Sequence, residues 1–523
     1  MEKKNNNDVK TVSFIMVITL IGKIMGLVRD QFLASNYSIG IEANAFLTAS
    51  RIPRVFFDVV FASAISASFI PVFNEYMKKY GREESFKLSN NFITLVGVFT
   101  TAVTILGILF APQLTTLFAD GFDEETALLC TKLVRILFPT TIFTGIAFSF
   151  VGILQSMDEF NVPAAMSIAS NLVIIIYFIF FNDRFGIYGL TAAFLLGWAM
   201  QALVQIPPLV KKKFSYRPYI NLKDEGLKKI ISLMLPVMVS TWIQPINIAI
   251  NTKYASRLLE GSGVSAIEYA NTVYSIIVGV FVLSVANVIF PKLSRMNIDD
   301  NKSGFSATVG STLEAMAFLL IPMTAGLMAL SGPVISLIYE HGKFGDYAVG
   351  LTSNALFFFS IGMIGFGIQT ILSRAYYAKQ NGKVPLLSGV ASIIINIFLC
   401  SVLSEPMGIG GLALASSVST VVAGIILLLP TQKNDKIISR DNLKQYLKMA
   451  VSAIIMAGAV AVCRDMLTNI IGQSVISKII LVGIPTFIGI LIYMVLTYIL
   501  NVPQAKTAFG FGIKFLKGKG KND

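Results

Sequence analysis

Long apolar stretches recur along the whole chain and alternate with short polar connections. A helix needs roughly 20 mostly apolar residues to cross a membrane. Fourteen stretches approach that length: 11–28, 56–72, 91–111, 132–154, 163–181, 186–208, 229–250, 264–290, 310–331, 350–375, 385–404, 409–430, 446–463 and 477–500. The pattern predicts an all-α polytopic membrane protein with about 14 transmembrane helices.

Basic residues mark alternate connections between these stretches. They lie before the first stretch, in the tail, and after the second, sixth, eighth, tenth and twelfth stretches. An excess of Lys and Arg is typical of cytoplasmic connections. The first stretch has no clean cleavage site and is interpreted as a spanning helix. We therefore expect a multi-pass protein of the bacterial inner membrane with both termini in the cytoplasm.

An internal repeat divides the chain. Residues 162–208 match residues 384–430 at a constant offset of 222, so that Gly186 falls on Gly408. The repeat holds six predicted helices, an even number, so both copies enter the membrane in the same orientation. We expect two parallel six-helix lobes, 1–210 and 229–432, joined by a basic cytoplasmic linker, 211–228. Residues 433–523 add two further transmembrane helices and a basic cytoplasmic tail.

Composition narrows the class of protein. Of the residues, 54% are hydrophobic and 14% are charged, whereas soluble proteins carry about a quarter charged residues. The net charge of +13 lies mostly in short connections, which favours contact with anionic lipid over nucleic acid. With one histidine (His341), three scattered cysteines and no phosphate-binding loop of an ATPase, we expect no enzyme, no cofactor and no metal site. If the two lobes form a transporter, as parallel repeats often do, its driving force would be substrate flow, the membrane potential or a gradient of a coupling ion, sodium or proton.

The first two predicted helices carry most of the charges inside the membrane. Charged residues there are costly and usually line a water-filled interior. Lys23, Gly26 and Asp30 lie on one face of the first helix. Arg51, Arg54 and Asp58 repeat the same spacing in the second helix. We expect four cations to bind a phosphate or pyrophosphate, with Gly26 and three carboxylates positioning or gating them. The cations are Lys23, Arg29, Arg51 and Arg54, and the carboxylates are Asp30, Glu42 and Asp58. The alternative is internal ion pairs that only neutralise each other.

The corresponding region of the second half is less charged. It offers a possible second-lobe cavity lined by Gln244, Asn247, Asn251, Lys253 and Asn271. Pro245 predicts a kink that frees backbone carbonyl groups. Amides and carbonyls could hold a sodium ion, and hydrogen bonding between helices is the favoured alternative.

Several short motifs resemble one known family. They are Gly22–Asp30 (GKIMGLVRD), Asn44-Ala45-Phe46, Arg51-Ile52-Pro53 and Ser68–Tyr76 (SFIPVFNEY). Their succession is similar to the MurJ (MviN) family of lipid II flippases, within the superfamily of multidrug and oligosaccharide-lipid exporters. The resemblance extends from about residue 12 to about residue 430.

The resemblance implies a cationic cavity between the lobes and a hydrophobic groove beside the last two helices. It implies that a lipid-linked peptidoglycan precursor, lipid II, moves from the cytoplasmic to the outer leaflet by alternating access. The expected partners are this anionic substrate, anionic membrane lipids and cell-wall synthesis proteins. The family's two first-helix arginines fall on Lys23 and Arg29, and the aspartate that follows falls on Asp30.

The sequence departs from the family pattern at Lys23, Asn44, Phe57 and Thr272. These departures keep open a flippase for another undecaprenyl-pyrophosphate-linked glycan. An ion-coupled drug antiporter is a further alternative, which predicts acidic cavity residues. A membrane scaffold that recruits cell-wall enzymes is the last alternative.

Overall fold

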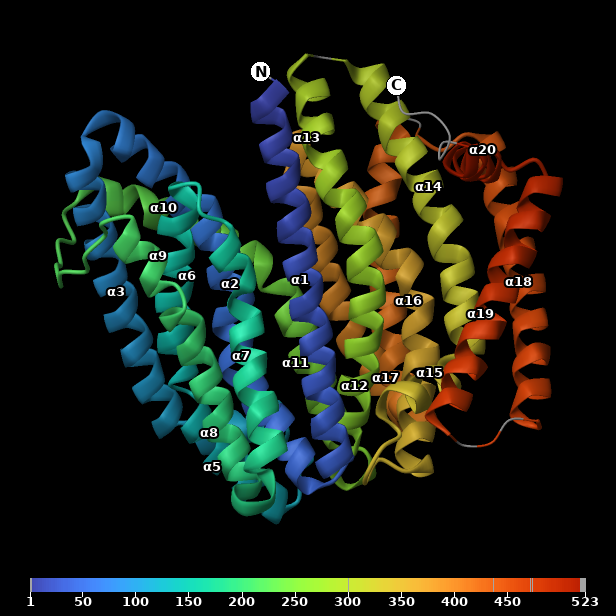
Figure 1. Ribbon diagram of the computed structural model, residues 1–523, viewed down its shortest axis with the longest axis horizontal. Coiled ribbons are helices and arrows are strands. Elements are labelled where there is room, and N and C mark those ends of the chain that lie inside the picture. Colours follow the sequence, from blue (N-terminus) through green and yellow to red (C-terminus); the bar gives the residue numbers. More distant parts are fainter. Residues whose placement is uncertain (1, 300, 436, 471, 473, 518–523) are drawn as a thin grey trace. The chain divides into compact units, whose positions relative to one another are not determined.

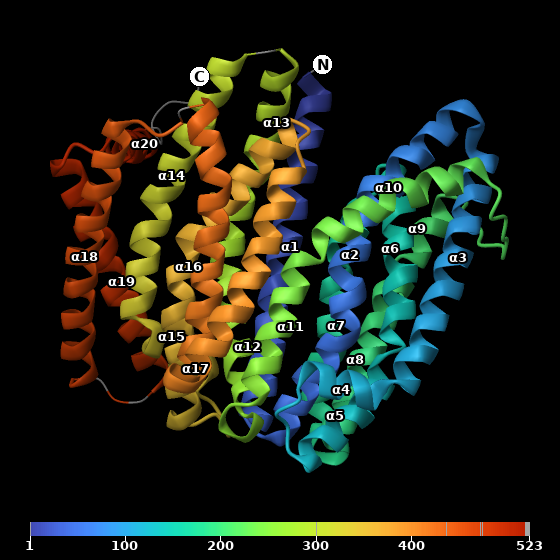
Figure 2. The ribbon, with the colours of Figure 1, turned by 180° about the vertical axis from the view of Figure 1, so that it is seen from behind.

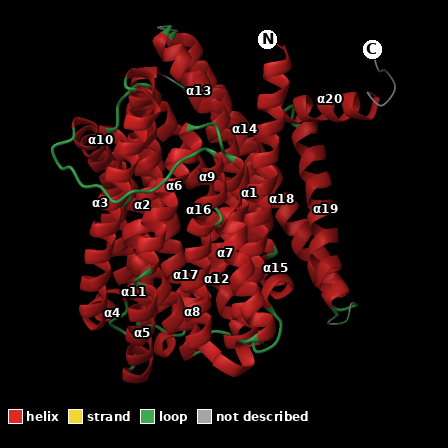
Figure 3. Ribbon diagram, turned by 60° about the vertical axis from the view of Figure 1, so that its left-hand side comes forward, coloured by secondary structure: helices red, strands yellow, loops and turns green. Residues whose placement is uncertain are grey.

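The computed structural model describes residues 2–299, 301–435, 437–470, 472 and 474–517. In these residues the secondary structure is helical and contains no strand (Figure 3). The helices of the first half are α1 (Glu2–Tyr37), α2 (Ile41–Lys79), α3 (Gly81–Leu109), α4 (Ala111–Phe118), α5 (Glu124–Leu137), α6 (Thr140–Ser156), α7 (Asn161–Phe180), α8 (Asn182–Leu203), α9 (Ile206–Lys211), α10 (Glu225–Thr241) and α11 (Ile243–Ser256) (Figure 1).

A short 3₁₀ turn, Leu259–Gly261, leads into the second half of the chain. Its helices are α12 (Gly263–Val278), a π-helical turn (Gly279–Leu283), α13 (Ser284–Ile298), α14 (Lys302–Ala329), α15 (Ser331–Tyr339), α16 (Asp346–Ala378), α17 (Lys383–Asp435), α18 (Arg440–Thr468), α19 (Val475–Ile499) and α20 (Pro503–Lys517). The predicted all-α class is confirmed.

The predicted spanning segments all lie in helices. Among the described residues, 10 helical segments are long and apolar enough to cross a membrane. One of them, Lys383–Lys433, contains two predicted spans, one on each side of Gly408. The remaining three predictions fall in α1, α2 and the α10–α11 pair. A polytopic membrane protein with about fourteen spans is therefore confirmed.

The internal repeat is visible in the backbone. Gly186 in α8 has φ 53° and ψ −147°, and Gly408 in α17 has φ 56° and ψ −134°. This region is open almost only to glycine, because a side chain would clash with the backbone. The two residues that align at an offset of 222 thus kink their helices in the same way. The repeat therefore preserves local structure as well as sequence.

The chain forms two compact units, of which the first ends at Ser265 and the second begins at Ala266. The first unit includes α10, which packs beside α2 (Figure 2). Leu227, Ile230 and Met234 of α10 share one buried core with Phe69 and Phe73 of α2. The two units are defined by contacts between residues, whereas the predicted lobes are defined by the sequence repeat. The units therefore do not test the lobe boundaries, which stay predictions.

The core of the second unit joins α14 to the last two long helices. Phe318, Met456 and Tyr493 are buried together, and the Tyr493 hydroxyl donates to the Phe318 carbonyl over 3.1 Å. The short helix α20 runs across the ends of α18 and α19 (Figure 3). Gln504 at its start donates to Glu314 of α14 over 2.7 Å, which fixes α20 to the rest of the unit.

Candidate functional site

Close contact between α1 and α7 sets the position of Arg29. A Cβ atom at Gly22 would lie 2.4 Å from the Ser167 hydroxyl oxygen, so a side chain there would force the hydroxyl to rotate away. Asn171 of α7 donates to the Gly22 carbonyl over 3.3 Å. The Oδ1 atom of the same Asn171 accepts from Nη1 of Arg29 over 3.1 Å. Asn171 therefore joins the helix contact to the guanidinium.

Arg29 also pairs with its neighbour Asp30. Its Nε and Nη2 atoms lie 2.9 Å and 2.7 Å from Asp30 Oδ1. The two side chains are only 21% and 15% exposed, and buried charges need such partners to offset lost hydration. This geometry fits the predicted positioning role of Asp30, although the role itself remains a prediction.

Two aromatic residues of α8 bring cations of α1 and α2 to one place. Phe194 and Trp198 stack with their ring centroids 4.4 Å apart. The Cζ atom of Arg29 lies 5.8 Å from the Phe194 ring, and that of Arg54 lies 5.7 Å from the Trp198 ring. Both distances are within reach of cation–π attraction. We call Arg29, Arg54, Phe194 and Trp198 the cation cluster.

Three residues around Arg29 and Arg54 were not predicted from the sequence: Asn171, Phe194 and Trp198. Phe194 and Trp198 stand four residues apart on the predicted sixth span, and the chain has only two tryptophans. That spacing puts both rings on one helix face, so it was a usable signal. For Asn171 the sequence held no comparable signal, because one amide in an apolar helix does not indicate its partner.

The other predicted cations and carboxylates are less tightly gathered. Nη1 of Arg51 donates to Thr252 of α11 over 3.1 Å. Lys23 is half-buried on α1, and Glu42 is exposed in the first turn of α2. The side chain of Asp58 lies outside the described residues. Gly26 has space around it, since an added Cβ atom would meet only Asn171 at 3.7 Å.

Asn44 explains how the chain tolerates one departure from the family pattern. Its Oδ1 atom accepts from the backbone amide of Ser265 over 2.8 Å, in the first turn of α12. Its Nδ2 atom donates to the carbonyls of Ile39 and Gly40, each over 2.7 Å. Asparagine can do both, whereas an aspartate could only accept. Asn44 thus binds the start of α12 to the start of α2.

The predicted second-lobe residues fall into both units. Asn247 and Lys253 lie on α11 in the first unit with Gln244 and Asn251, and Asn271 lies in the second unit. The Oδ1 atom of Asn247 is buried without a hydrogen-bond partner among the described residues. The ammonium of Lys253 lies 3.3 Å from Asp120, so part of its charge is neutralised. Whether these residues form a cavity remains a prediction.

The cation cluster can bind an anion. Guanidinium groups donate forked hydrogen bonds to phosphate oxygens, and Arg29 and Arg54 come from different helices to one aromatic pair. Within the described residues, no three His, Cys, Asp or Glu side chains gather as they would around a metal ion. Recognition of an anion by these residues stays a prediction.

Comparison with known proteins identifies the family. The sequence model described as lipid II flippase MurJ matches residues 34–512. This chain belongs to that family. It is 30% identical over 421 residues to the probable lipid II flippase MurJ of Vibrio cholerae, covering 78% of this chain and 80% of the relative. It is 27% identical over 495 residues to that of Thermotoga maritima, covering 95% and 97%.

Solved structures agree with the sequence comparison. A lipid II flippase MurJ in an inward closed conformation has a TM-score of 0.78 and 26% identity, over 93% of this chain and 98% of that chain. An inward-facing multidrug resistance transporter of the MATE family, in the MOP superfamily, has a TM-score of 0.67 at 15% identity, over 81% and 98%. The second likeness shows a shared fold alone. The predicted MurJ family is confirmed.

Proposed function

We propose that this protein is a flippase that moves lipid II from the cytoplasmic to the outer leaflet. The observation that carries the proposal is the family match over residues 34–512. The arrangement of Arg29 and Arg54 supports it, because lipid II presents a pyrophosphate beside its lipid chain. Membership of a transporter family and the lack of a recognisable catalytic motif both favour transport without catalysis.

The head group would bind at the cation cluster. Arg29 and Arg54 would hold the pyrophosphate, with Lys23 and Arg51 adding positive charge nearby. The side chain of Asp30 now engages two nitrogens of Arg29, and a bound phosphate would compete with it. Exchange of partners at Arg29 could then link binding to a change between inward-open and outward-open states.

The lipid tail would follow an apolar cavity of about 430 Å³ in the second unit. Its walls come from α12, α14, α15, α18 and α19. They include Phe318, Met323, Met456, Val460, Ile490 and Tyr493. A cavity with almost no polar groups suits a hydrocarbon chain, since burial of apolar surface drives such binding.

We further propose that both termini lie in the cytoplasm. Basic residues in alternate connections support this orientation. The tail adds Lys514, Lys517, Lys519 and Lys521 on the same side. Anionic lipids would surround these residues, and cell-wall synthesis proteins would receive the transported substrate. The driving force would be substrate flow, the membrane potential or an ion gradient.

A flippase for another undecaprenyl-pyrophosphate-linked glycan is the second candidate. Lys23 and Thr272 favour it, because both replace arginines of the family pattern. The cation cluster fits either substrate, since the pyrophosphate is common to both. The same excess of cations argues against a carrier of cationic drugs. A scaffold without transport activity predicts that the cations are dispensable.

Complementation tests the proposal. The resident lipid II flippase of a bacterial host is depleted while the wild-type chain, Arg29→Ala or Arg54→Ala is expressed at equal levels. Rescue by the wild type alone supports lipid II transport through the cation cluster. Rescue by all three chains would support lipid II as the substrate but would show that the cation cluster is not its binding site. Failure of a well-expressed wild type contradicts lipid II as the substrate.

A further inference from the structure

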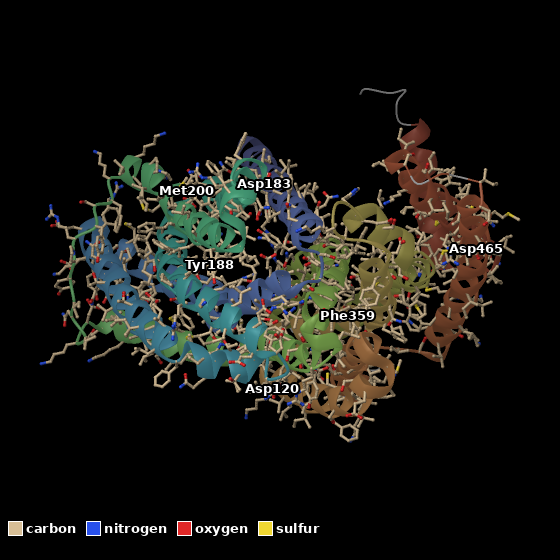
Figure 4. All side chains as sticks on the ribbon, turned by 90° about the horizontal axis from the view of Figure 1, so that it is seen from below. Asp120, Asp183, Tyr188, Met200, Phe359 and Asp465 are labelled. Carbon is tan, nitrogen blue, oxygen red and sulfur yellow. The ribbon has the colours of Figure 1, made fainter. Side chains whose placement is uncertain are left out.

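An ion cluster joins two loops that are far apart in the sequence. Asp120 lies between α4 and α5, and Arg257 follows α11 directly. Nε and Nη2 of Arg257 lie 2.8 Å and 2.6 Å from the two oxygens of Asp120. The ammonium of Lys253 lies 3.3 Å from the same carboxylate. Such forked pairing fixes direction as well as distance. Asp120 is labelled in Figure 4.

The backbones of the two loops also touch. The amide of Gly121 donates to the Ser256 hydroxyl over 3.2 Å. A Cβ atom at Gly121 would lie 2.4 Å from Cα of Arg257, so any side chain there would push the loops apart. At Gly261 an added Cβ would lie 2.9 Å from the Phe122 ring. Contacts on both sides of the ion cluster thus close the two loops together.

The charge of Asp120 is maintained over the physiological pH range. The hydrogen bond from Arg257, assisted by Lys253, lowers the pKa of the Asp120 carboxyl below its ordinary value, although partial burial opposes this. The carboxylate therefore stays ionised whenever the two cations face it.

The loops have a defined place in the proposed topology. They follow the third and seventh predicted spans, which puts both on the outer side. The seventh span, α10–α11, is also the first helix of the second sequence repeat. Thr252 of α11, the residue before Lys253, accepts from Arg51 over 3.1 Å. Helix α11 therefore links this cluster directly to a predicted substrate-binding cation.

We propose that Asp120, Arg257 and Lys253 form an outer latch, which must open before the substrate leaves for the outer leaflet. The proposal rests on the proposed function, because it assigns the latch to the exit step of transport. Arg257, Lys253 and Asp120 are 49%, 35% and 24% exposed. Water and ions reach such pairs, so their strength is modest. A latch of this kind can break and re-form in every cycle.

The latch is tested by labelling a buried cysteine from outside the cell. Thr252 is fully buried, and Thr252→Cys is introduced into a chain whose three native cysteines are replaced. A membrane-impermeant maleimide is then added to intact spheroplasts. Asp120→Arg or Arg257→Asp puts like charges together, and each should raise the labelling rate roughly two- to fivefold, the scale of one exposed ion pair. Asp120→Arg combined with Arg257→Asp should return the rate toward that of the parent.

Each outcome decides the proposal. Folding of every variant is checked by gel filtration in detergent, so that misfolded chains are not read as open ones. An unchanged labelling rate in folded single variants overturns the latch. Faster labelling that the double exchange does not reverse also overturns it, since packing and not charge would then hold the loops. Labelling does not depend on the substrate, so failure of complementation would contradict the proposed function without affecting this result.

Discussion

Arg29 is the residue on which the candidate site depends most. Asp30, Asn171 and Phe194 surround its guanidinium on different sides. A side chain held this firmly loses little further freedom when it binds a ligand, which favours affinity. Lys23, in contrast, is a half-buried point charge on a flexible stem and cannot fork its hydrogen bonds.

Replacing Arg29 should therefore reduce transport strongly. Hydrogen bonds to charged groups contribute about 1.5–3 kcal/mol, so Arg29→Ala should slow lipid II transport roughly 10- to 100-fold. Arg29→Lys should recover only part of the rate, because it restores charge without the fork. The matched control is Arg184→Ala. Arg184 also lies over an aromatic ring, with its Cζ atom 5.4 Å from the centre of the Phe185 ring, but its side chain is exposed and it is far from Arg29 in the sequence. An equal loss in the control would refute a specific role for Arg29.

At Asp120 the sign of the pH dependence follows from its lowered pKa. A carboxyl with a lowered pKa in the folded state adds stability above its unfolded pKa of about 3.9 and loses it as the pH falls further. The wild type should therefore exceed Asp120→Asn in thermal stability by a constant amount between pH 5 and pH 8, both pH values being well above about 3.9. The difference should shrink below about pH 4. A difference that grew on acidification would contradict this assignment.

Two helices of the repeat owe their kinks to single glycines. No atom lies within 4 Å of a Cβ added at Gly186 or Gly408, so only the backbone opposes a side chain there. Gly186→Ala and Gly408→Ala should each destabilise the protein by about 1–3 kcal/mol. The matched control is Gly97→Ala in α3, where space is also open and the backbone is helical. It should be neutral or stabilising. Thermal unfolding in detergent measures all three, and equal effects would exclude the backbone explanation.

The last helix, α20, is held by one carboxylate. Glu314 of α14 accepts from Gln504 over 2.7 Å and also from Asn442 of α18. Glu314→Ala would leave both amides without this partner and should loosen α20. Hydrogen exchange of residues 503–510 should then become several-fold faster, on the scale of a lost hydrogen bond to a charged group. Unchanged exchange would show that packing alone, such as Tyr498 against Phe509, fixes the helix.

Across the whole molecule, apolar length was enough to predict the spans, because membrane-crossing helices must be long and apolar. The breaks within spans were harder to place. Pro139 separates α5 from α6, whereas Trp242, between α10 and α11, is not a residue that breaks helices. Pro245 has no amide hydrogen, and its ring clashes with the carbonyl of the residue four positions earlier, Thr241, where α10 ends. The kink predicted from Pro245 is therefore confirmed.

The charged residues of the candidate site could be predicted from the sequence, whereas their contacts could not. Charges within apolar stretches located Arg29 and Arg54, because their cost in a membrane makes them informative. The aromatic pair that gathers them, and the contact of Asp120 with Arg257 across 137 positions, depend on which helices become neighbours. Neither can be obtained from the spacing of residues in one chain. The contact of Lys253 with Asp120 was unforeseen for the same reason.

Movement of lipid II across the membrane is measured most directly by its arrival in the outer leaflet. Cells depleted of their own flippase and expressing this chain are treated with an externally added enzyme that cleaves lipid II, and the cleaved fraction is measured. Cleavage is expected with the wild type, and little cleavage is expected with Arg29→Ala at equal expression. Lipid II that stays protected in cells with abundant wild-type protein would contradict transport of lipid II by this chain.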